Sequence, residues 1–196
     1  MNLNDHLIIF IKNPELGKVK TRLASGIGDE KALEVYNQLL KITHDQTQPV
    51  SCIKHVCYSD HVDDSDNWDK TDYHKHVQSN GGLGERMLGA FQGVFDRGAE
   101  KMVIIGSDCP EITTDILNEA FLMLDKYDVV IGPAKDGGYY LLGMKCPLPM
   151  LFKNKEWSTD SVFADTILDL IDMGLSHYRL KELSDLDTIY DLPLLE

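Results

Sequence analysis

Short apolar runs alternate along the chain with longer segments in which apolar residues recur every three or four positions. The apolar runs predict strands at residues 7–12, 53–59, 73–78, 101–106, 128–131, 139–144 and 178–180. The longer segments predict helices at residues 29–43, 84–97, 115–126 and 161–173. Strands that alternate with helices indicate an α/β protein with a mostly parallel sheet.

The strand at residues 101–106 indicates how this sheet is covered. It contains four consecutive apolar residues, Met102 to Ile105. Strands of this kind belong to sheets that are covered on both faces. Because ligands bind at the carboxyl ends of the strands in such sheets, we expect the functional residues in the loops that follow the strands.

Charge and length narrow the classes of function. The 196 residues fit one domain of about 100–200 residues. The chain has 19 Lys and Arg against 32 Asp and Glu, a formal net charge of −13. This balance disfavours nucleic-acid and acidic-membrane partners, which need a basic surface.

The expected location is cytoplasmic, without membrane insertion. No early apolar run approaches the ~20 residues of a membrane span, and no basic segment precedes the first run as in a signal peptide. The four cysteines form no CxxC pair and no zinc-ligand pattern. They are therefore typical of free thiols in a reducing compartment.

The loop after the first strand departs from the overall acidity. Residues 12–22 contain four cations and one carboxylate, and the cations are Lys12, Lys18, Lys20 and Arg22. Gly17 allows close backbone approach, and lysine and arginine bind phosphate oxygens through charge-assisted hydrogen bonds. The loop is not a P-loop, because the GxxxxGK[ST] pattern is absent. It predicts either a phosphate site or a solvated basic loop.

A glycine-rich segment precedes the helix predicted at residues 84–97. Residues 78–84 read Gln-Ser-Asn-Gly-Gly-Leu-Gly. Backbone amides at a helix N-terminus favour an anion or a polar ligand edge. Tight turns require the same glycines, so the segment predicts either a ligand site or a structural turn.

Asp108 follows the most apolar strand, in the sequence Gly-Ser-Asp-Cys-Pro. A carboxylate in this place suits a hard divalent cation, which prefers oxygen ligands. Alternatively, Asp108 caps the following turn, since Asp-x-Pro favours turns. Cys109 has no identifiable activating base, and we interpret it as structural.

The loop before the strand at residues 139–144 contains Asp136, Gly137, Gly138 and Tyr139. The two glycines let a backbone lie against a substrate, the aspartate can accept hydrogen bonds from sugar hydroxyls, and the tyrosine offers an aromatic face. Asp-Gly-Gly also predicts a hairpin between the neighbouring strands. The two interpretations are compatible.

Further acidic and histidine residues leave alternatives open. Asp185 and Asp187 project to the same side if the chain is extended, and they could complete a metal site begun by Asp108. Equally, Asp187 or Thr188 could simply cap the last short helix. His74 and His76 share one strand face without a third ligand, so we interpret them as a solvated face rather than a metal site. The acidic residues 60–72 are interpreted as a solvated surface loop.

Six motifs occur in a specific order between residues 7 and 192. They are FIKNPELGKVKTRLA, GGLGERM, GSDCPEIT, GPAKDGGYYLLG, WSTDSV and SDLDTIYDL. Together they resemble the bacterial glycosyltransferase-like family of radical-SAM/selenodomain-associated transferases, which is similar to the wider nucleotide-diphospho-sugar transferase superfamily. The resemblance implies a GT-A-like fold over residues 1–196 as a single domain. That fold is a three-layer α/β/α sandwich with a mostly parallel mixed sheet.

The resemblance also implies residue roles. The nucleotide-phosphate loop of the superfamily corresponds to the first loop, with Lys12, Gly17, Lys20 and Arg22. Its base-recognising segment corresponds to Gln78, Leu83 and Gly84. Its two metal-binding aspartates correspond to Asp108 and Asp187, and its acceptor region to Asp136, Gly137, Gly138 and Tyr139.

The implied activity is transfer from a nucleotide or nucleotide-sugar to a small-molecule acceptor. Asp108 and Asp187 would hold Mg²⁺ or Mn²⁺, while Lys20 and Arg22 would neutralise charge on the phosphates. Many glycosyltransferases of this fold carry Asp-x-Asp where this chain has Ser107-Asp108-Cys109. Glycosyl transfer and nucleotidyl transfer with release of pyrophosphate are therefore both expected alternatives. A nucleotide-binding protein without catalysis is a third.

Overall fold

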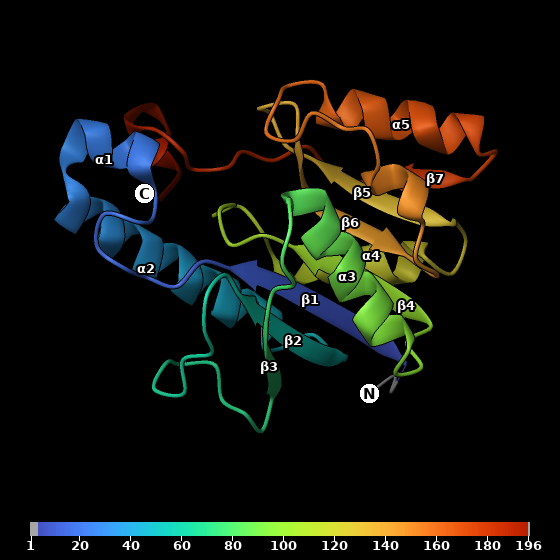
Figure 1. Cartoon of the computed structure of the whole chain (residues 1–196), viewed down its shortest axis with the longest axis horizontal. Helices are drawn as coiled ribbons and strands as arrows, with labels where there is room; N and C mark the ends of the chain where they lie inside the picture. Colours follow the sequence, from blue (N-terminus) through green and yellow to red (C-terminus); the bar gives the residue numbers. More distant parts are fainter. Residues whose placement is uncertain (1–3, 196) are drawn as a thin grey trace.

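A seven-stranded sheet forms the centre of the computed structural model, which describes residues 4–195 (Figure 1). The strands are β1 (Asp5–Ile11), β2 (Ile53–Tyr58), β3 (Tyr73–Val77), β4 (Lys101–Ile105), β5 (Val129–Pro133), β6 (Tyr139–Met144) and β7 (His177–Arg179). Their order across the sheet is β3-β2-β1-β4-β6-β5-β7. Each corresponds to a strand predicted from the apolar runs.

One strand runs against the others. β6 pairs antiparallel with both β4 and β5, whereas the remaining neighbours pair in parallel. The β5–β6 connection is the hairpin that Asp-Gly-Gly predicts, and its last pair joins Pro133 to Tyr139. The mostly parallel mixed sheet is therefore confirmed.

Helices cover both faces of the sheet. The helices are α1 (Thr21–Ile27), α2 (Asp29–Thr47), α3 (Leu83–Phe95), α4 (Thr114–Met123) and α5 (Val162–Asp172), with short 3₁₀ helices η1 (Pro149–Phe152) and η2 (Ile189–Leu195). α3, η1 and α5 pack on one face, and α2 and α4 pack on the other. The three-layer α/β/α sandwich is confirmed.

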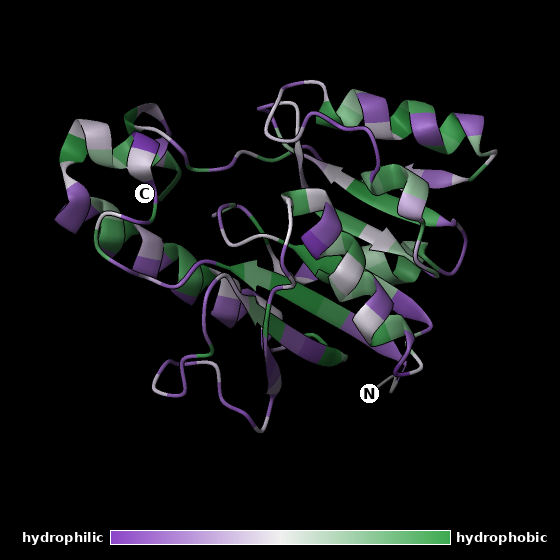
Figure 2. Cartoon of the chain, viewed as in Figure 1, coloured by the Kyte–Doolittle hydropathy of each residue, from purple (hydrophilic) through white to green (hydrophobic). Residues whose placement is uncertain are grey.

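Alternating side chains of β1 show how one strand serves both layers. Leu7, Ile9 and Ile11 belong to the buried cluster beneath α4, while Ile8 belongs to the cluster beneath α3. This follows from the twofold side-chain period of a strand. Figure 2 shows the result: the central strands are largely hydrophobic, and the helices alternate hydrophobic and hydrophilic positions.

The short helix α1 was not predicted, because residues 12–22 were interpreted as one loop. Its seven residues include Ser25 and Gly26, which are weak helix formers, and they span only two turns. The helix is stabilised by tertiary contacts instead: Leu23 is fully buried against α2, beside Leu186 of the C-terminal segment. Such contacts leave no local signal in the sequence.

Helix α1 contacts η2, and the two form a small unit at the carboxyl edge of the sheet, on the left in Figure 1.

Across residues 4–195, none of the helices combines the length and the apolar character needed to cross a membrane.

Candidate active site

Three distant segments bring opposite charges together where β1 and β4 end. The Lys20 ammonium lies 2.5 Å from Oδ1 of Asp108 and 3.1 Å from Oδ1 of Asp187. The Lys20 side chain is only 4% exposed, whereas those of Asp108 and Asp187 are 48% and 40% exposed. One buried cation therefore bridges the two aspartates that the sequence predicts as metal ligands.

Backbone hydrogen bonds fix the two aspartates relative to each other. The Leu186 N–H donates to the carbonyl of Asp108 over 2.9 Å, which ties the C-terminal segment to the loop after β4. The Asp191 carboxylate accepts from the N–H groups of Asp187 and Thr188, at 3.1 and 2.7 Å. Asp191 thus holds the turn that presents Asp187.

Lys20 adopts a backbone conformation that is unusual for a lysine. Its φ and ψ of 47° and 44° lie in the left-handed region, immediately before α1. This conformation costs of order 1–2 kcal/mol for a residue with a Cβ. Burial lowers the pKa of Lys20, but Asp108 and Asp187 outweigh it, so the pKa is raised and the ammonium stays charged.

Asp185 is the third carboxylate of this group. Burial, together with the charges of Asp108, Asp136 and Asp187, raises its pKa to about 7, and Lys20 offsets this only in part. The cluster therefore holds more negative charge than Lys20 neutralises. We call Lys20, Asp108, Asp136, Asp185 and Asp187 the acidic cluster.

A cationic hollow lies at the ends of β1 and β2. It has a volume of about 290 Å³, and its lining residues are Lys12, Asn13, Lys18, Ser59, Asp60 and Arg86. Three of the six are cations, in a chain of net charge −13. Its lysine and arginine side chains can donate charge-assisted hydrogen bonds to an anion.

Buried polar contacts shape this hollow. The Asn13 side-chain oxygen accepts from the N–H of Asp60 at 3.0 Å, and its amide donates to the His61 carbonyl at 2.9 Å. The buried Tyr36 hydroxyl donates to the Lys12 carbonyl and accepts from the Lys12 N–H, at 3.0 and 2.8 Å. These contacts hold the loop after β1 in place.

The four residues predicted for the phosphate loop do not all meet. Lys12 lines the hollow, but Lys20 lies in the acidic cluster. Arg22 is exposed, and its nearest ion-pair atom is Oδ2 of Asp187 at 3.8 Å. Gly17 has a φ of 74° and forms an exposed left-handed turn.

The predicted base-recognising residues have structural partners. The Gln78 amide donates to the carbonyls of Ile11 and Cys57 at 3.1 and 2.9 Å, which clamps the ends of β1 and β2. Gly84 is buried beneath Trp157, whose ring would lie 2.6 Å from an added Cβ. Leu83 is 44% exposed.

The loop of the predicted acceptor region packs against the chain itself. Gly137 has a φ of 89°, and an added Cβ would collide with the Asp160 backbone. Asp136 accepts from the Gly138 N–H at 2.8 Å. The Tyr139 ring packs edge-on against Trp157, and its buried hydroxyl makes no hydrogen bond within residues 4–195.

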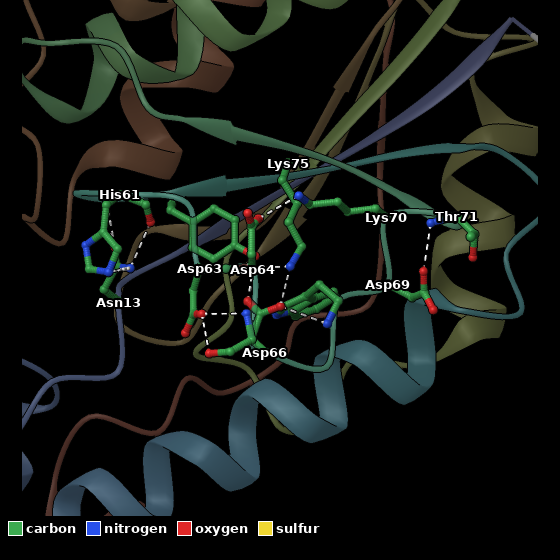
Figure 3. A network of polar contacts seen from close by, with 12 residues as sticks. Asn13, His61, Asp63, Asp64, Asp66, Asp69, Lys70, Thr71 and Lys75 are labelled. Carbon is green, nitrogen blue, oxygen red and sulfur yellow. Dashed lines mark hydrogen bonds and ion pairs between the residues drawn. The ribbon is translucent and has the colours of Figure 1, made fainter.

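The acidic residues 60–72 form a surface loop that a few buried side chains anchor (Figure 3). Asp66 accepts from the buried Lys75 ammonium at 2.6 Å and from the Tyr58 hydroxyl at 2.5 Å. Trp68 is 3% exposed and packs edge-on against Tyr73. Most of residues 60–72 are exposed, so the prediction of a solvated surface loop is confirmed. The buried Trp68 and the Asp66–Lys75 ion pair also hold this loop against β2 and β3.

His74 and His76 belong to a larger group that we call the histidine ladder, with His6 of β1 and His55 of β2. His6 Nδ1 lies 2.9 Å from His55 Nε2, and His55 Nδ1 lies 3.1 Å from His76 Nε2. His6 and His55 are 4% and 3% exposed. His74 is exposed, as the solvated face predicts, whereas His76 is half-buried beside the buried His55.

Burial and mutual repulsion disfavour the charged forms of His6, His55 and His76. Both effects lower the pKa of His55, to about 3, and the pKa values of His6 and His76 are also lowered. Cys109 is similarly unreactive, because burial raises its pKa to about 12. Its structural interpretation agrees with this.

A divalent cation fits two of the aspartates. An ammonium already lies within contact distance of both Asp108 and Asp187, so a metal ion in the same place could reach both. Mg²⁺ is commonly held by one or two carboxylates together with substrate phosphates. Within residues 4–195, no three His, Cys, Asp or Glu side chains are grouped so that they could hold a metal by themselves.

Comparison with known proteins identifies the family. Residues 42–159 match the family described as "Uncharacterized protein conserved in bacteria (DUF2064)". The chain belongs to this family. No curated protein matches it significantly.

Solved structures extend the comparison. A candidate nucleotide-diphospho-sugar transferase from Desulfovibrio desulfuricans G20 is 32% identical, with a TM-score of 0.90 over 98% of this chain and 86% of that chain. The resemblance of this DUF2064 protein to the nucleotide-diphospho-sugar transferase superfamily is thereby confirmed. The narrower radical-SAM/selenodomain association stays a prediction.

Two more distant structures share the fold. The 4-diphosphocytidyl-2C-methyl-D-erythritol synthase of Anaerococcus prevotii DSM 20548 is 12% identical, with a TM-score of 0.63 over 97% of this chain and 93% of that one. The inositol-1-phosphate CTP transferase of T. maritima is also 12% identical, with a TM-score of 0.56 over 96% and 91%.

Sequence reasoning missed several residues of the site. Arg86 and Asn13 line the hollow, and Trp157 covers Gly84. Arg86 lies inside the quoted motif GGLGERM, so a cation one turn into a helix that follows a glycine-rich loop was an available signal. Asn13 and Trp157 also lie inside quoted motifs, FIKNPELGKVKTRLA and WSTDSV, but their partners are distant in the sequence, so the motifs did not indicate what they contact.

Proposed function

We propose that this protein is a divalent-metal-dependent transferase that acts on a nucleotide or nucleotide-sugar. The observation that carries the proposal is the acidic cluster at the ends of β1 and β4, in a fold whose cationic hollow lies at the ends of β1 and β2. Relatives whose names describe nucleotide-using transferases support the same class.

The cationic and the acidic residues would have different roles. Lys12, Lys18 and Arg86 would bind phosphate oxygens in the hollow. Asp108 and Asp187 would hold Mg²⁺ or Mn²⁺, which when bound supplies positive charge against a diphosphate. A small acceptor would bind near Asp136, whose carboxylate belongs to the same electrostatic group as Asp185.

Two donor chemistries remain in competition. Glycosyl transfer from a nucleotide-sugar releases a nucleotide, and nucleotidyl transfer from a triphosphate releases pyrophosphate. The glycosyltransferase-like motifs favour the first. The second is favoured by the motif at Asp108, which has one aspartate instead of Asp-x-Asp, and by the names of two similar structures, a CTP transferase and a diphosphocytidyl-product synthase.

The test is a thermal-shift screen of nucleoside triphosphates, diphosphates and nucleotide-sugars, with and without Mn²⁺. A ligand that binds the folded state raises the melting temperature, and the shift grows with the ratio of the ligand concentration to its Kd. We expect a Mn²⁺-dependent shift, followed by release of nucleotide or of pyrophosphate with a suitable acceptor. A flat screen would refute the proposal, and tight binding without turnover of any mixture would indicate a non-catalytic nucleotide-binding protein.

A matched pair of arginines sharpens the screen. Arg86 and Arg97 each donate to a backbone carbonyl near α3, those of Gly81 and Gly93, but only Arg86 lines the hollow. Arg86→Gln should reduce the nucleotide shift, and Arg97→Gln should leave it unchanged. Equal losses in both variants would argue against the hollow as the phosphate site.

A further inference from the structure

The Lys20 ammonium occupies the place that a metal would take between the two aspartates. It contacts Asp108 and Asp187 at once, and its side chain is 4% exposed. The resemblance assigned this lysine to phosphates, but in the structure both of its ion pairs are with carboxylates. In this structure the lysine that the resemblance implies for phosphates is therefore engaged with the predicted metal ligands.

The surrounding charge makes some cation necessary here. The charges of Asp108, Asp136 and Asp187 act on Asp185, and Lys20 offsets them in part. Arg22 reaches Asp187 only at 3.8 Å from an exposed position. Without a cation in contact, like charges at this spacing repel strongly.

The backbone conformation indicates that this placement is specific. Lys20 lies in the left-handed region at the entry to α1, and its carbonyl accepts from the Ala24 N–H at 2.8 Å. A glycine would adopt this conformation without strain. The strained lysine directs its charge to the aspartates instead.

We propose that Lys20 is a built-in counter-ion that a divalent cation displaces. In the nucleotide-free protein its ammonium neutralises Asp108 and Asp187. The cation that accompanies the nucleotide takes this place, and the ammonium becomes available to the phosphates. The proposal rests on the proposed function and adds its regulation: free metal binds weakly, and metal and nucleotide strengthen each other's binding.

The test measures binding of Mn²⁺ alone by calorimetry or electron paramagnetic resonance, without any nucleotide. Removal of the competing ammonium in Lys20→Met should tighten Mn²⁺ binding about tenfold or more. Lys20→Gln, which keeps a hydrogen-bond donor for the carboxylates, should show the same gain and serves if the methionine variant does not fold. Lys20→Arg keeps the charge and should bind Mn²⁺ as weakly as the wild type.

Lys155 provides a matched control. Its side chain is 3% exposed and its ammonium lies 2.6 Å from Asp169, so Lys155→Met also removes a buried lysine from an aspartate. This variant should gain no Mn²⁺ affinity, because it frees one carboxylate rather than a pair. A gain equal to that of Lys20→Met would overturn the proposal.

The proposal also fails if neither neutral variant at Lys20 binds Mn²⁺ more tightly than the wild type. This outcome is separable from failure of the proposed function, because the titration needs no nucleotide and the nucleotide screen uses the wild type. If no nucleotide shifts the melting temperature but the Lys20 variants gain Mn²⁺ affinity, the proposed transferase function is refuted and the counter-ion role of Lys20 stands. If a nucleotide shifts the melting temperature but the variants gain no Mn²⁺ affinity, the counter-ion role is refuted and the proposed function stands.

Discussion

The acidic cluster brings aspartate carboxylates together at the sheet, and the histidine ladder brings imidazoles together. The two regions differ in how repulsion between charged groups is avoided. In the acidic cluster, carboxylates at the carboxyl ends of the strands share the ammonium of Lys20. In the ladder, His6, His55 and His76 line one face of β1–β3 and hydrogen-bond to one another. One region is charged and compensated, and the other is neutral.

This difference in charge and exposure indicates which of the two regions can bind a ligand. Neutral imidazoles that satisfy one another form a closed structural network, for which burial is tolerable because no charge is desolvated. Half-exposed carboxylates around one lysine form an open network with excess negative charge. The open network can exchange its cation, so function is expected there.

The pH response should also have opposite signs in the two regions. The pKa of His55 is lowered in the folded state, to about 3, so its contribution to stability is present above pH 6.5 and is lost as the pH falls. The pKa of Asp185 is raised to about 7, so its contribution is present below its unfolded value of 3.8 and is lost as the pH rises through 7. The two effects oppose each other between about pH 4 and pH 6.5, and single variants are needed to separate them.

The largest expected effect comes from removing an aspartate from the acidic cluster. Asp108→Asn should weaken Mn²⁺-dependent nucleotide binding by about 100-fold or more, because a bound cation would lose one of its two protein ligands. The measurement is titration of the Mn²⁺–nucleotide complex that the screen identifies. Asp187→Asn should behave alike, and wild-type affinity in either variant would show that these aspartates hold no metal.

The next effect concerns the histidine ladder. In the wild type, acid favours the unfolded chain, because His55 is protonated there and stays neutral in the folded state. Between pH 6.5 and pH 5 this should lower the free energy of unfolding by about 2 kcal/mol. A variant without the imidazole should lack this loss. Urea denaturation of the wild type and His55→Gln at both pH values measures it. We expect the variant to be less stable at pH 8, with a stability that depends less on acid. An unchanged difference between the two proteins at all pH values would mean that His55 is not held neutral.

The smallest effect tests the excess negative charge. Asp185→Asn should stabilise the protein at pH 8 by about 1 kcal/mol, a figure reduced for partial exposure. The gain should fade toward pH 4, where Asp185 of the wild type is protonated in the folded state. Denaturation of both proteins across this range provides the measurement, and a destabilised variant at pH 8 would show that Lys20 fully compensates the cluster.

Much of the fold could be predicted, because the strands and helices follow from the local spacing of apolar residues. The apolar run at residues 101–106 became the central strand β4, and Asp-Gly-Gly became the hairpin between β5 and β6. Helix α1 could not be predicted, since its stability comes from contacts of Leu23 with a segment near the other end of the chain.

The residues of the candidate site were predictable, but most of their partners were not. Asp108 and Asp187 were predicted as one metal-binding pair; the structure brings them together on the ammonium of Lys20, which had been assigned to phosphates. Gln78 was assigned to a base, yet its amide clamps two strand ends. The partner of a polar side chain depends on which strands become neighbours, which a linear pattern does not specify.

The sequence by itself determined the alternation of strands and helices, the edge of the sheet where function is expected, and the acidic character of the whole chain. The tertiary structure alone decided where each charge went. It buried Lys20 between two aspartates and stacked histidines from three strands. The physical reason is that periodicity depends on neighbours along the chain, whereas charge pairing depends on distance in space, and that distance is set only when the sheet order is complete.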